Sequence, residues 1–175
     1  MARYLTKSRF KLALECPTKL YYTDKPDLYE NQKKEDAFLQ ALAEGGYQVG
    51  ELAKAYYPGG VLIETLDYDE AIRQTDVLLA QEHTIIYEAA FRSGNLFVRA
   101  DLVVKKGREL EIIEVKSKSH DSSGADGMRS KKGDSILSNW LPYIQDVAFQ
   151  KYVVTLAKPD LTVFASLMTA DKDKS

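Results

Sequence analysis

Hydrophobic residues in the first half of the chain recur at the spacing of amphipathic helices. Five segments show this spacing: residues 7–14, 17–22, 31–44, 47–57 and 68–81. Thr6 and Ser8 are alternative caps for the first helix, because each side chain carries a hydroxyl oxygen that can accept a backbone N–H. The Gly45-Gly46 pair is expected to separate the third helix from the fourth, since glycine weakens a helix interior.

The pattern changes in the middle of the chain, where β-branched and aromatic residues dominate. Four runs have this composition: residues 61–65, 84–91, 95–105 and 109–119. Ser93-Gly94-Asn95 and Lys106-Gly107-Arg108 separate the last three runs and are typical of tight turns. The sequence therefore predicts a short first strand and then three strands joined by two hairpins.

The remaining segments complete the expected fold. Residues 119–134 are polar and without periodicity, which predicts an exposed loop. Residues 136–157 return to helical spacing with Pro142 in the first turn, and residues 161–168 predict a last strand. We therefore expect one α/β domain over residues 1–175, α+β-like, with a central mixed sheet flanked by helices.

Composition changes this picture little. The formal net charge is -2 and the sequence pI is about 5.8, so the chain lacks the global basic bias of many nucleic-acid-binding proteins. Acidic metal ligands lower the net charge, while a local basic strip can still follow a phosphate backbone. The distribution of charge is therefore more informative than its sum.

Cysteine usage and hydropathy indicate the compartment. Cys16 is the only cysteine, so neither an intrachain disulfide nor a cysteine-based metal site can be completed within the chain. The N-terminal segment does not resemble a secretory signal, and no stretch approaches the roughly 18 apolar residues of a membrane span. We expect a soluble, cytoplasmic protein with no membrane partner.

The stretch VRADLVVKKGRELEIIEVKSKS carries the most informative chemistry. Glu114 and Lys116 lie two residues apart on one predicted strand, so their side chains share a face. If the hairpin turns at Gly107, Asp101 faces Glu114 across the strand pair. Two converging carboxylates form an oxygen-rich site that suits Mg²⁺ or Mn²⁺, and a neighbouring lysine can orient an attacking water.

A structural interpretation stays open beside the catalytic one. Glu-x-Lys pairs are common on exposed strand faces, where they contribute only small electrostatic effects. Glu114 follows the apolar residues Ile112-Ile113, however, and an isolated buried carboxylate needs a partner or a metal. The residues alone therefore predict either a metal site or a structural ion pair.

The string EAAF…LFVRADLVV…ELEIIEVKSKS…YIQDVAFQKYVV resembles the RecB-like branch of the PD-(D/E)xK nuclease superfamily. That branch includes CRISPR-associated adaptation exonucleases and helicase-fused exonucleases, and the likeness extends over about residues 4–168. It implies a restriction-endonuclease-like core with the order α-β-β-β-α-β, preceded here by extra N-terminal helices. It also implies a metal-dependent deoxyribonuclease of DNA repair or CRISPR-like pathways, with a helicase or another domain as a partner.

The resemblance assigns roles to particular residues. Asp101 and Glu114 match the metal-binding acids, and the Val115 backbone carbonyl is the expected third oxygen ligand. Lys116 matches the catalytic lysine, and Gln150 matches the glutamine of the following helix. The implied reaction is hydrolysis of DNA phosphodiester bonds, with exonuclease action favoured by the family likeness alone.

Two further acids are candidates because the chain departs from the family pattern. Many relatives carry a histidine four residues after a glycine in the helix before the sheet, whereas here Gly46 is followed by Gly50. Glu51 is the next acid and a candidate metal ligand, with a solvated helix position as the alternative. Glu88, on the strand before Asp101, is either a ligand or a supporting acid that pairs with lysine or arginine.

The N-terminal segment LTKSRFKLALECPTKLYY resembles that of iron–sulfur members of the branch. Those proteins need three more cysteines near the C-terminus, so an iron–sulfur cluster is not expected from Cys16 alone. Either this sequence is a piece of a longer protein, which the charged C-terminal residues favour, or Cys16 is a small buried hydrophobe.

A basic group beside the predicted site is the candidate DNA contact, with a solvated surface as the alternative. It comprises Lys118, Arg129, Lys131 and Lys132. A second function also stays open: the departures from the family pattern are compatible with a nucleic-acid-binding or scaffold module that keeps the fold without efficient turnover.

Overall fold

The computed structural model describes residues 3–23, 25, 28–29, 37–120, 127–130 and 133–171, and the side chains of residues 37–43 lie outside the described set. The helices are α1 (Lys7–Glu15), α2 (Pro17–Tyr22), α3 (Ala37–Tyr56), α4 (Tyr68–Leu79) and α5 (Leu141–Ala157). The strands are β1 (Leu5–Thr6), β2 (Val61–Leu62), β3 (His83–Ser93), β4 (Leu96–Lys106), β5 (Glu109–His120) and β6 (Thr162–Asp171).

These strands form one open, mixed sheet in the order β2-β3-β4-β5-β6, and β1 pairs with β4 beside this path. Two antiparallel hairpins join β3 to β4 and β4 to β5, as the sequence predicts. The turns use Gly94 (φ 57°) and Gly107 (φ 58°), which adopt the left-handed conformation that favours glycine. β6 pairs with β5 in parallel because α5 carries the chain back across the sheet.

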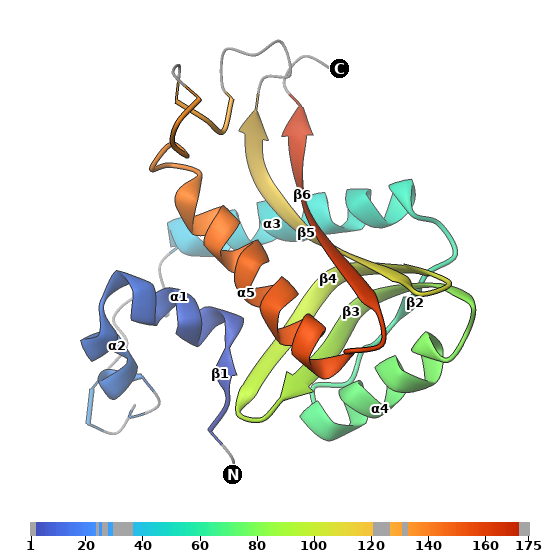
Figure 1. Cartoon of the computed structure of the whole chain (residues 1–175). Helices are drawn as coiled ribbons and strands as arrows, with labels where there is room; N and C mark the ends of the chain where they lie inside the picture. The colour runs from blue at the N-terminus through green and yellow to red at the C-terminus, as the bar shows by residue number, and fades with distance from the viewer. Residues whose placement is uncertain are drawn as a thin grey trace.

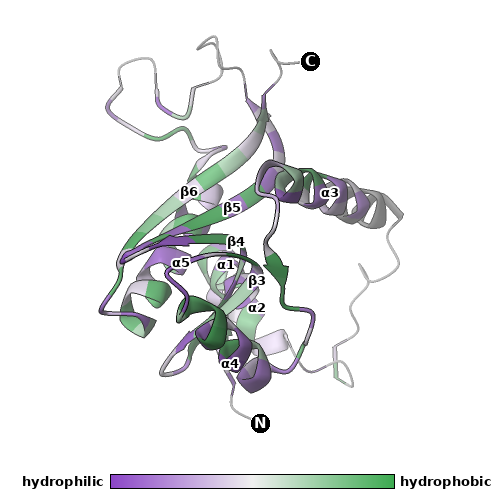
Figure 2. Ribbon diagram, turned by 90° about the vertical axis from the view of Figure 1, so that its right-hand side faces the viewer, coloured by the Kyte–Doolittle hydropathy of each residue, from purple (hydrophilic) through white to green (hydrophobic). Residues whose placement is uncertain are grey.

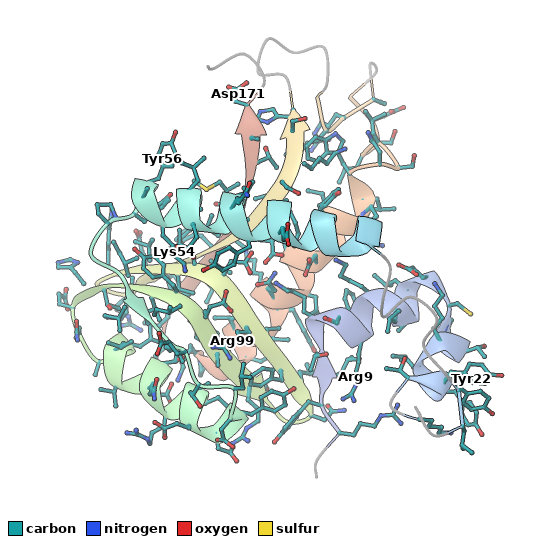
Figure 3. The ribbon with its side chains drawn as sticks, turned by 180° about the vertical axis from the view of Figure 1, so that it is seen from behind. Arg9, Tyr22, Lys54, Tyr56, Arg99 and Asp171 are labelled. Carbon is teal, nitrogen blue, oxygen red and sulfur yellow. The ribbon has the colours of Figure 1, made fainter. Side chains whose placement is uncertain are left out.

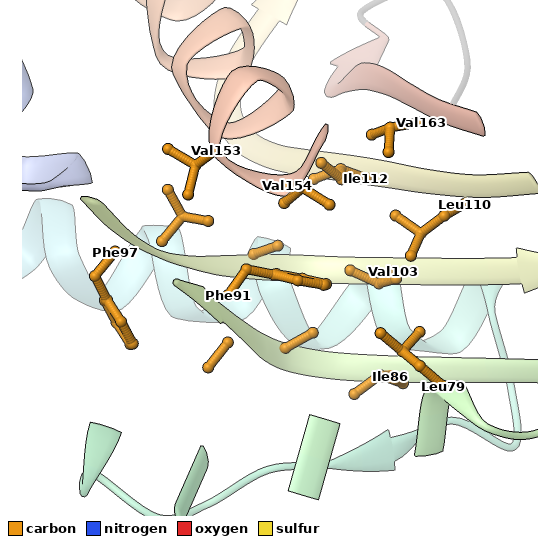
Figure 4. Close-up of a cluster of buried hydrophobic side chains, with 14 of the residues drawn as sticks. Leu79, Ile86, Phe91, Phe97, Val103, Leu110, Ile112, Val153, Val154 and Val163 are labelled. Atoms are coloured by element: carbon orange, nitrogen blue, oxygen red, sulfur yellow. The ribbon is translucent and has the colours of Figure 1, made fainter. Parts of the chain in front are cut away.

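Helices flank the sheet on both faces, so the expected α/β class with a central mixed sheet is confirmed. Figure 1 shows α5 in front of the sheet and α3 behind it, and the turned view in Figure 2 places the two helices on opposite sides. The main core lies between the sheet and the α4–α5 layer, where Val153 and Val154 pack near Ile112 and Val163 (Figure 4). A smaller cluster around Tyr87 lies on the other face.

The expected break at Gly45-Gly46 is wrong. α3 continues through this pair from Ala37 to Tyr56. A glycine in a helix interior costs only about 0.5–1 kcal/mol relative to alanine. Packing of the helix against the sheet, where Ala53 is buried, offsets that cost.

The last helix begins later than the spacing predicts, at Leu141 instead of residue 136. Pro142 lies in the first turn, as expected, because its missing N–H would break the hydrogen bonding of a helix that began a turn or more earlier. Thr6 caps α1, with its side chain accepting from the Arg9 backbone N–H. Cys16, between α1 and α2, is partly exposed and not buried.

A helix that crosses a membrane must be both long and apolar. None of the helices in the described part of the chain meets both conditions.

Candidate active site

Regular strand pairing is interrupted at one level of the sheet. β3 and β4 pair on both sides of Glu88 and Asp101 but not at these two residues. The β4–β5 ladder ends one position before Asp101 and Glu114 would pair. Glu88 has a φ of 60°, a conformation that costs a non-glycine residue about 1–3 kcal/mol and that clusters at functional sites. The backbone therefore departs from the ladder where the candidate acids lie.

Glu114 is fully buried and is held by donors from three elements. Lys7 of α1 places its Nζ 3.1 Å from Oε1 and 2.9 Å from Oε2. Lys116, two residues along β5, also donates to Oε1, so the shared face expected for this pair is confirmed. Gln150 of α5 donates from Nε2 to Oε2 at 2.7 Å. A buried carboxylate needs such partners, because water no longer solvates its charge.

Asp101 lies beside this group and is partly exposed, with 29% of its side chain accessible. Its Oδ2 accepts a hydrogen bond from the Val115 backbone N–H at 2.8 Å, which joins β4 to β5 where the ladder has ended. Its Oδ1 lies 3.4 Å from Lys7 Nζ. Asp101 and Glu114 therefore converge on a single ammonium group, although they are 13 residues apart in the sequence.

The surroundings shift the pKa values of Asp101 and Glu114 in opposite directions. Burial raises the pKa of Asp101 to about 6, although Lys7 opposes the shift. Burial also disfavours the charged form of Glu114, but Lys7 and Lys116 outweigh it and bring the pKa of Glu114 down to about 2. Burial lowers the pKa of Lys7, and its acidic neighbours more than reverse this, so the Lys7 pKa lies above its ordinary value. At neutral pH both carboxylates are therefore mainly ionised, and both contact the Lys7 ammonium.

A buried aspartate, Asp146, supports the site and was not among the residues predicted from the sequence. It lies four residues before Gln150 on α5, and Gln150 Nε2 reaches its Oδ1 at 3.3 Å. Its Oδ2 lies 3.4 Å from Lys116 Nζ and 3.8 Å from Lys11 Nζ. Burial and Glu114 raise its pKa. The helical spacing from Gln150 was the available signal, since residues four apart share a helix face.

Lys7 was also missed, and no local signal could have found it. The sequence places Lys7 94 residues before Asp101 and 107 residues before Glu114. Only the packing of α1 beside α5 brings the lysine to the acids; the stacked rings of Phe10 and Phe149, 4.3 Å apart, fix this contact. The lysine therefore belongs to the site through tertiary structure alone.

A cavity of about 260 Å³ opens beside the acids, between α3 and the sheet. Its walls include Asp101, Val115 and Lys116, together with the two further candidates, Glu51 and Glu88. Figure 3, which views the molecule from the α3 side, shows the neighbouring Lys54 between α3 and the strands. The structure thus brings all five of these predicted residues to one cavity.

Glu51 and Glu88 each have a cationic partner at this cavity. Glu51 pairs with Lys54 at 2.6 Å, one turn along α3. Glu88 pairs with Arg99 Nε at 3.0 Å, which is the arginine contact expected of a supporting acid. Gly50, the residue just before Glu51, also lines the cavity.

The predicted basic group is only partly within the described residues. Lys118 Nζ lies 4.7 Å from the centre of the Trp140 ring and 5.7 Å from that of Tyr143, so it packs on aromatic faces. Arg129 is exposed and donates to the Gly133 carbonyl at 3.1 Å. Lys131 and Lys132 lie outside the described residues.

The acids and their contacts fit a hard divalent cation. Three carboxylate oxygens of Asp101 and Glu114 surround the Lys7 ammonium within 3.4 Å, so they already converge on a positive charge. Mg²⁺ typically binds one or two protein carboxylates and takes its other ligands from water and substrate phosphates. Over residues 3–171, apart from the gaps noted above, no group of three acid, histidine or cysteine side chains forms a metal site.

Comparison with models of known protein families, with curated proteins and with solved structures finds no match to this chain. The functional argument therefore depends on the geometry of the site. Its strongest element is the convergence of two strand carboxylates, two lysines and a buried glutamine.

Proposed function

We propose that this protein is a metal-dependent DNA nuclease with a restriction-endonuclease-like core, which hydrolyses phosphodiester bonds and acts as an exonuclease. One observation carries the proposal: Asp101 and Glu114, from neighbouring strands, both contact the Lys7 ammonium, and Lys116 also contacts Glu114. A purely structural ion pair would need neither a second acid nor a cavity beside it. The resemblance in sequence to PD-(D/E)xK nucleases supports the same reaction.

In this proposal each residue of the site has a separate chemical role. Asp101, Glu114 and the Val115 carbonyl supply oxygen ligands for Mg²⁺ or Mn²⁺. When bound, such a cation polarises the scissile phosphate and lowers the pKa of a nearby water. Lys116 orients the attacking water and stabilises the developing negative charge. Gln150 holds the Glu114 carboxylate in place from α5.

Metal dependence tests this proposal. We expect the purified chain to degrade end-labelled linear DNA with Mn²⁺, and we expect EDTA to stop the reaction, because the cation supplies the electrophilic chemistry. An exonuclease should leave a covalently closed circle of the same sequence intact. The measurement is release of label over time on a denaturing gel. DNA binding without degradation in Mn²⁺ or Mg²⁺ would instead indicate a binding or scaffold module.

The same metal can decide between the two further acids. A crystal grown with Mn²⁺ should place Asp101 and Glu114 oxygens within about 2.0–2.6 Å of the ion, the range for hard oxygen ligands. Either Glu51 or Glu88 at that distance would be assigned as an additional ligand. An ion bound away from Asp101 and Glu114 would refute the proposed ligand set.

Replacing Lys7 with methionine should tighten Mn²⁺ binding. The Lys7 ammonium and a divalent cation compete for the same oxygens of Asp101 and Glu114, and methionine keeps the apolar stem without the charge. We expect the Kd for Mn²⁺ to fall about tenfold, equivalent to about 1.4 kcal/mol. Isothermal titration calorimetry measures this directly.

Lys11→Met is the matched control for this substitution. Lys11 lies one turn further along α1, and its ammonium faces Asp146 instead of the proposed ligands. Its replacement should change the Mn²⁺ affinity far less than Lys7→Met does. If Lys7→Met bound Mn²⁺ no more tightly than the wild type, the Lys7 ammonium and the metal ion would not compete for the same oxygens.

A further inference from the structure

A second cavity, of about 390 Å³, lies next to the acids, and the proposed reaction does not use it. Its size falls within the range of small-molecule binding pockets. It is lined by Thr6, Lys7, Ser8, Leu66, Tyr68, Phe97 and Arg99. The end of β1 with the start of α1, the start of α4 with the segment before it, and the first part of β4 therefore form its walls.

One wall of this cavity is aromatic and apolar. The Tyr68 and Phe97 rings stack with centroids 4.2 Å apart, which holds Tyr68 in a fixed orientation while 42% of the residue stays exposed. Leu66 is 84% exposed beside it. Flat, partly exposed aromatic rings of this kind are the surfaces on which nucleic-acid bases stack.

The other lining residues of the cavity carry positive charge and hydroxyl groups. Lys7 reaches it from α1, between Thr6 and Ser8. Arg99 is held rigidly, because its guanidinium donates to Glu88, to the Thr65 carbonyl at 2.8 Å and to the Ile63 carbonyl. Cations beside hydroxyls match the chemistry of a phosphodiester.

Two ion pairs connect this cavity to the candidate active site. Lys7 lines the second cavity and contacts Asp101, which lines the first. Arg99 also lines the second cavity and pairs with Glu88 of the first. A strand whose phosphate lies at Asp101 can therefore place its neighbouring nucleotide in the second cavity.

We propose that this second cavity is a nucleotide subsite, in which Tyr68 stacks on a base of single-stranded DNA and Lys7 contacts the phosphate that leads to the active site. The subsite rests on the proposed nuclease function, since it names where the substrate strand lies. Lys7 thus acts as a substrate-positioning residue as well as the cation that balances the acids.

Binding measured without a metal tests the subsite apart from cleavage. The probe is a fluorescein-labelled oligothymidylate of about eight nucleotides, a length within the usual range for single-strand sites. In EDTA, fluorescence anisotropy should show that Tyr68→Ala weakens binding about tenfold, the usual loss of one stacked base, while Tyr68→Phe restores most of it. A thermal melt of each variant confirms that it is folded.

A second substitution avoids any effect on the core. Leu66→Asp changes an exposed residue and adds a negative charge to the cavity wall, so it should weaken oligothymidylate binding by about tenfold. Val77→Asp is the control, because Val77 is a 60% exposed apolar residue of α4 that does not line the cavity. Equal binding by Leu66→Asp and Val77→Asp would overturn the subsite.

The two proposals fail in different ways. The subsite would be refuted, and the nuclease supported, if the protein cleaved DNA with Mn²⁺ but substitutions at Tyr68 and Leu66 did not change oligothymidylate binding. Binding that depends on Tyr68 and Leu66, with no cleavage in any divalent metal, would support the subsite and refute the nuclease.

Discussion

Asp101→Ala should abolish Mn²⁺-dependent DNA cleavage, with a loss of about a thousandfold or more, since a catalytic cation lowers the activation barrier by several kcal/mol. Within the described part of the chain, Asp101 and Glu114 are the acids that contact the Lys7 ammonium, and the Asp101 oxygen lies 3.4 Å from Lys7 Nζ. Its removal should also weaken Mn²⁺ binding. Initial cleavage rates and calorimetric titration with Mn²⁺ measure the two effects.

This substitution should leave the domain folded. The Asp101 pKa is raised from 3.8 to about 6, so its contribution to stability is lost as the pH rises through that interval. At neutral pH the ionised carboxylate disfavours folding, and alanine removes that effect, although the Val115 N–H loses its acceptor. Asp76→Ala, at a surface pair with Lys158, is the control. Cleavage by folded Asp101→Ala at the wild-type rate would rule out the mechanism.

Lys116→Ala should reduce cleavage by about a hundredfold to a thousandfold, the range for removing one group that stabilises charge in the transition state. Unlike Asp101→Ala, it should not weaken Mn²⁺ binding, because the ligand oxygens remain and a competing positive charge is lost. Glu114 keeps Lys7 and Gln150 as partners, so we expect the domain to fold. A reduced cleavage rate with undiminished Mn²⁺ affinity would show that Lys116 acts on the reaction and not on metal binding.

Lys106→Ala is the matched control, because Lys106 is an exposed lysine at the far end of the hairpin that carries Asp101. It should retain both cleavage and Mn²⁺ affinity. If Lys116→Ala cleaved DNA as fast as Lys106→Ala, the lysine would be structural. If it lost Mn²⁺ binding together with cleavage, its effect would be on the arrangement of Glu114.

The hairpin and the shared face of Glu114 and Lys116 were predictable from the sequence. Strand alternation is a local property, and the glycine turn at Gly107 sets which residues face one another. Asp101 and Glu114 therefore come to the same level once the turn is located. Gln150 required the family resemblance, since nothing in its own helix indicates that it reaches the glutamate.

Other features were misjudged because local signals compete with packing. Gly45-Gly46 is a helix-weakening pair, yet α3 runs through it, since contact with the sheet outweighs the local cost. The strained backbone at Glu88 had no sequence signal, because glutamate rarely adopts positive φ. The interruption of the ladder beside Asp101 was likewise outside sequence reasoning.

The sequence by itself determined the class of the fold, the hairpin and the acid–lysine group on it, because turn chemistry and strand periodicity act over a few residues. Only the tertiary structure decided that Lys7 joins that group, that the face of α5 with Asp146 reaches Lys116, and that a second cavity adjoins the site. The physical reason is that these contacts arise where α1 and α5 pack together beside the sheet. Their side chains meet across separations that no local pattern encodes.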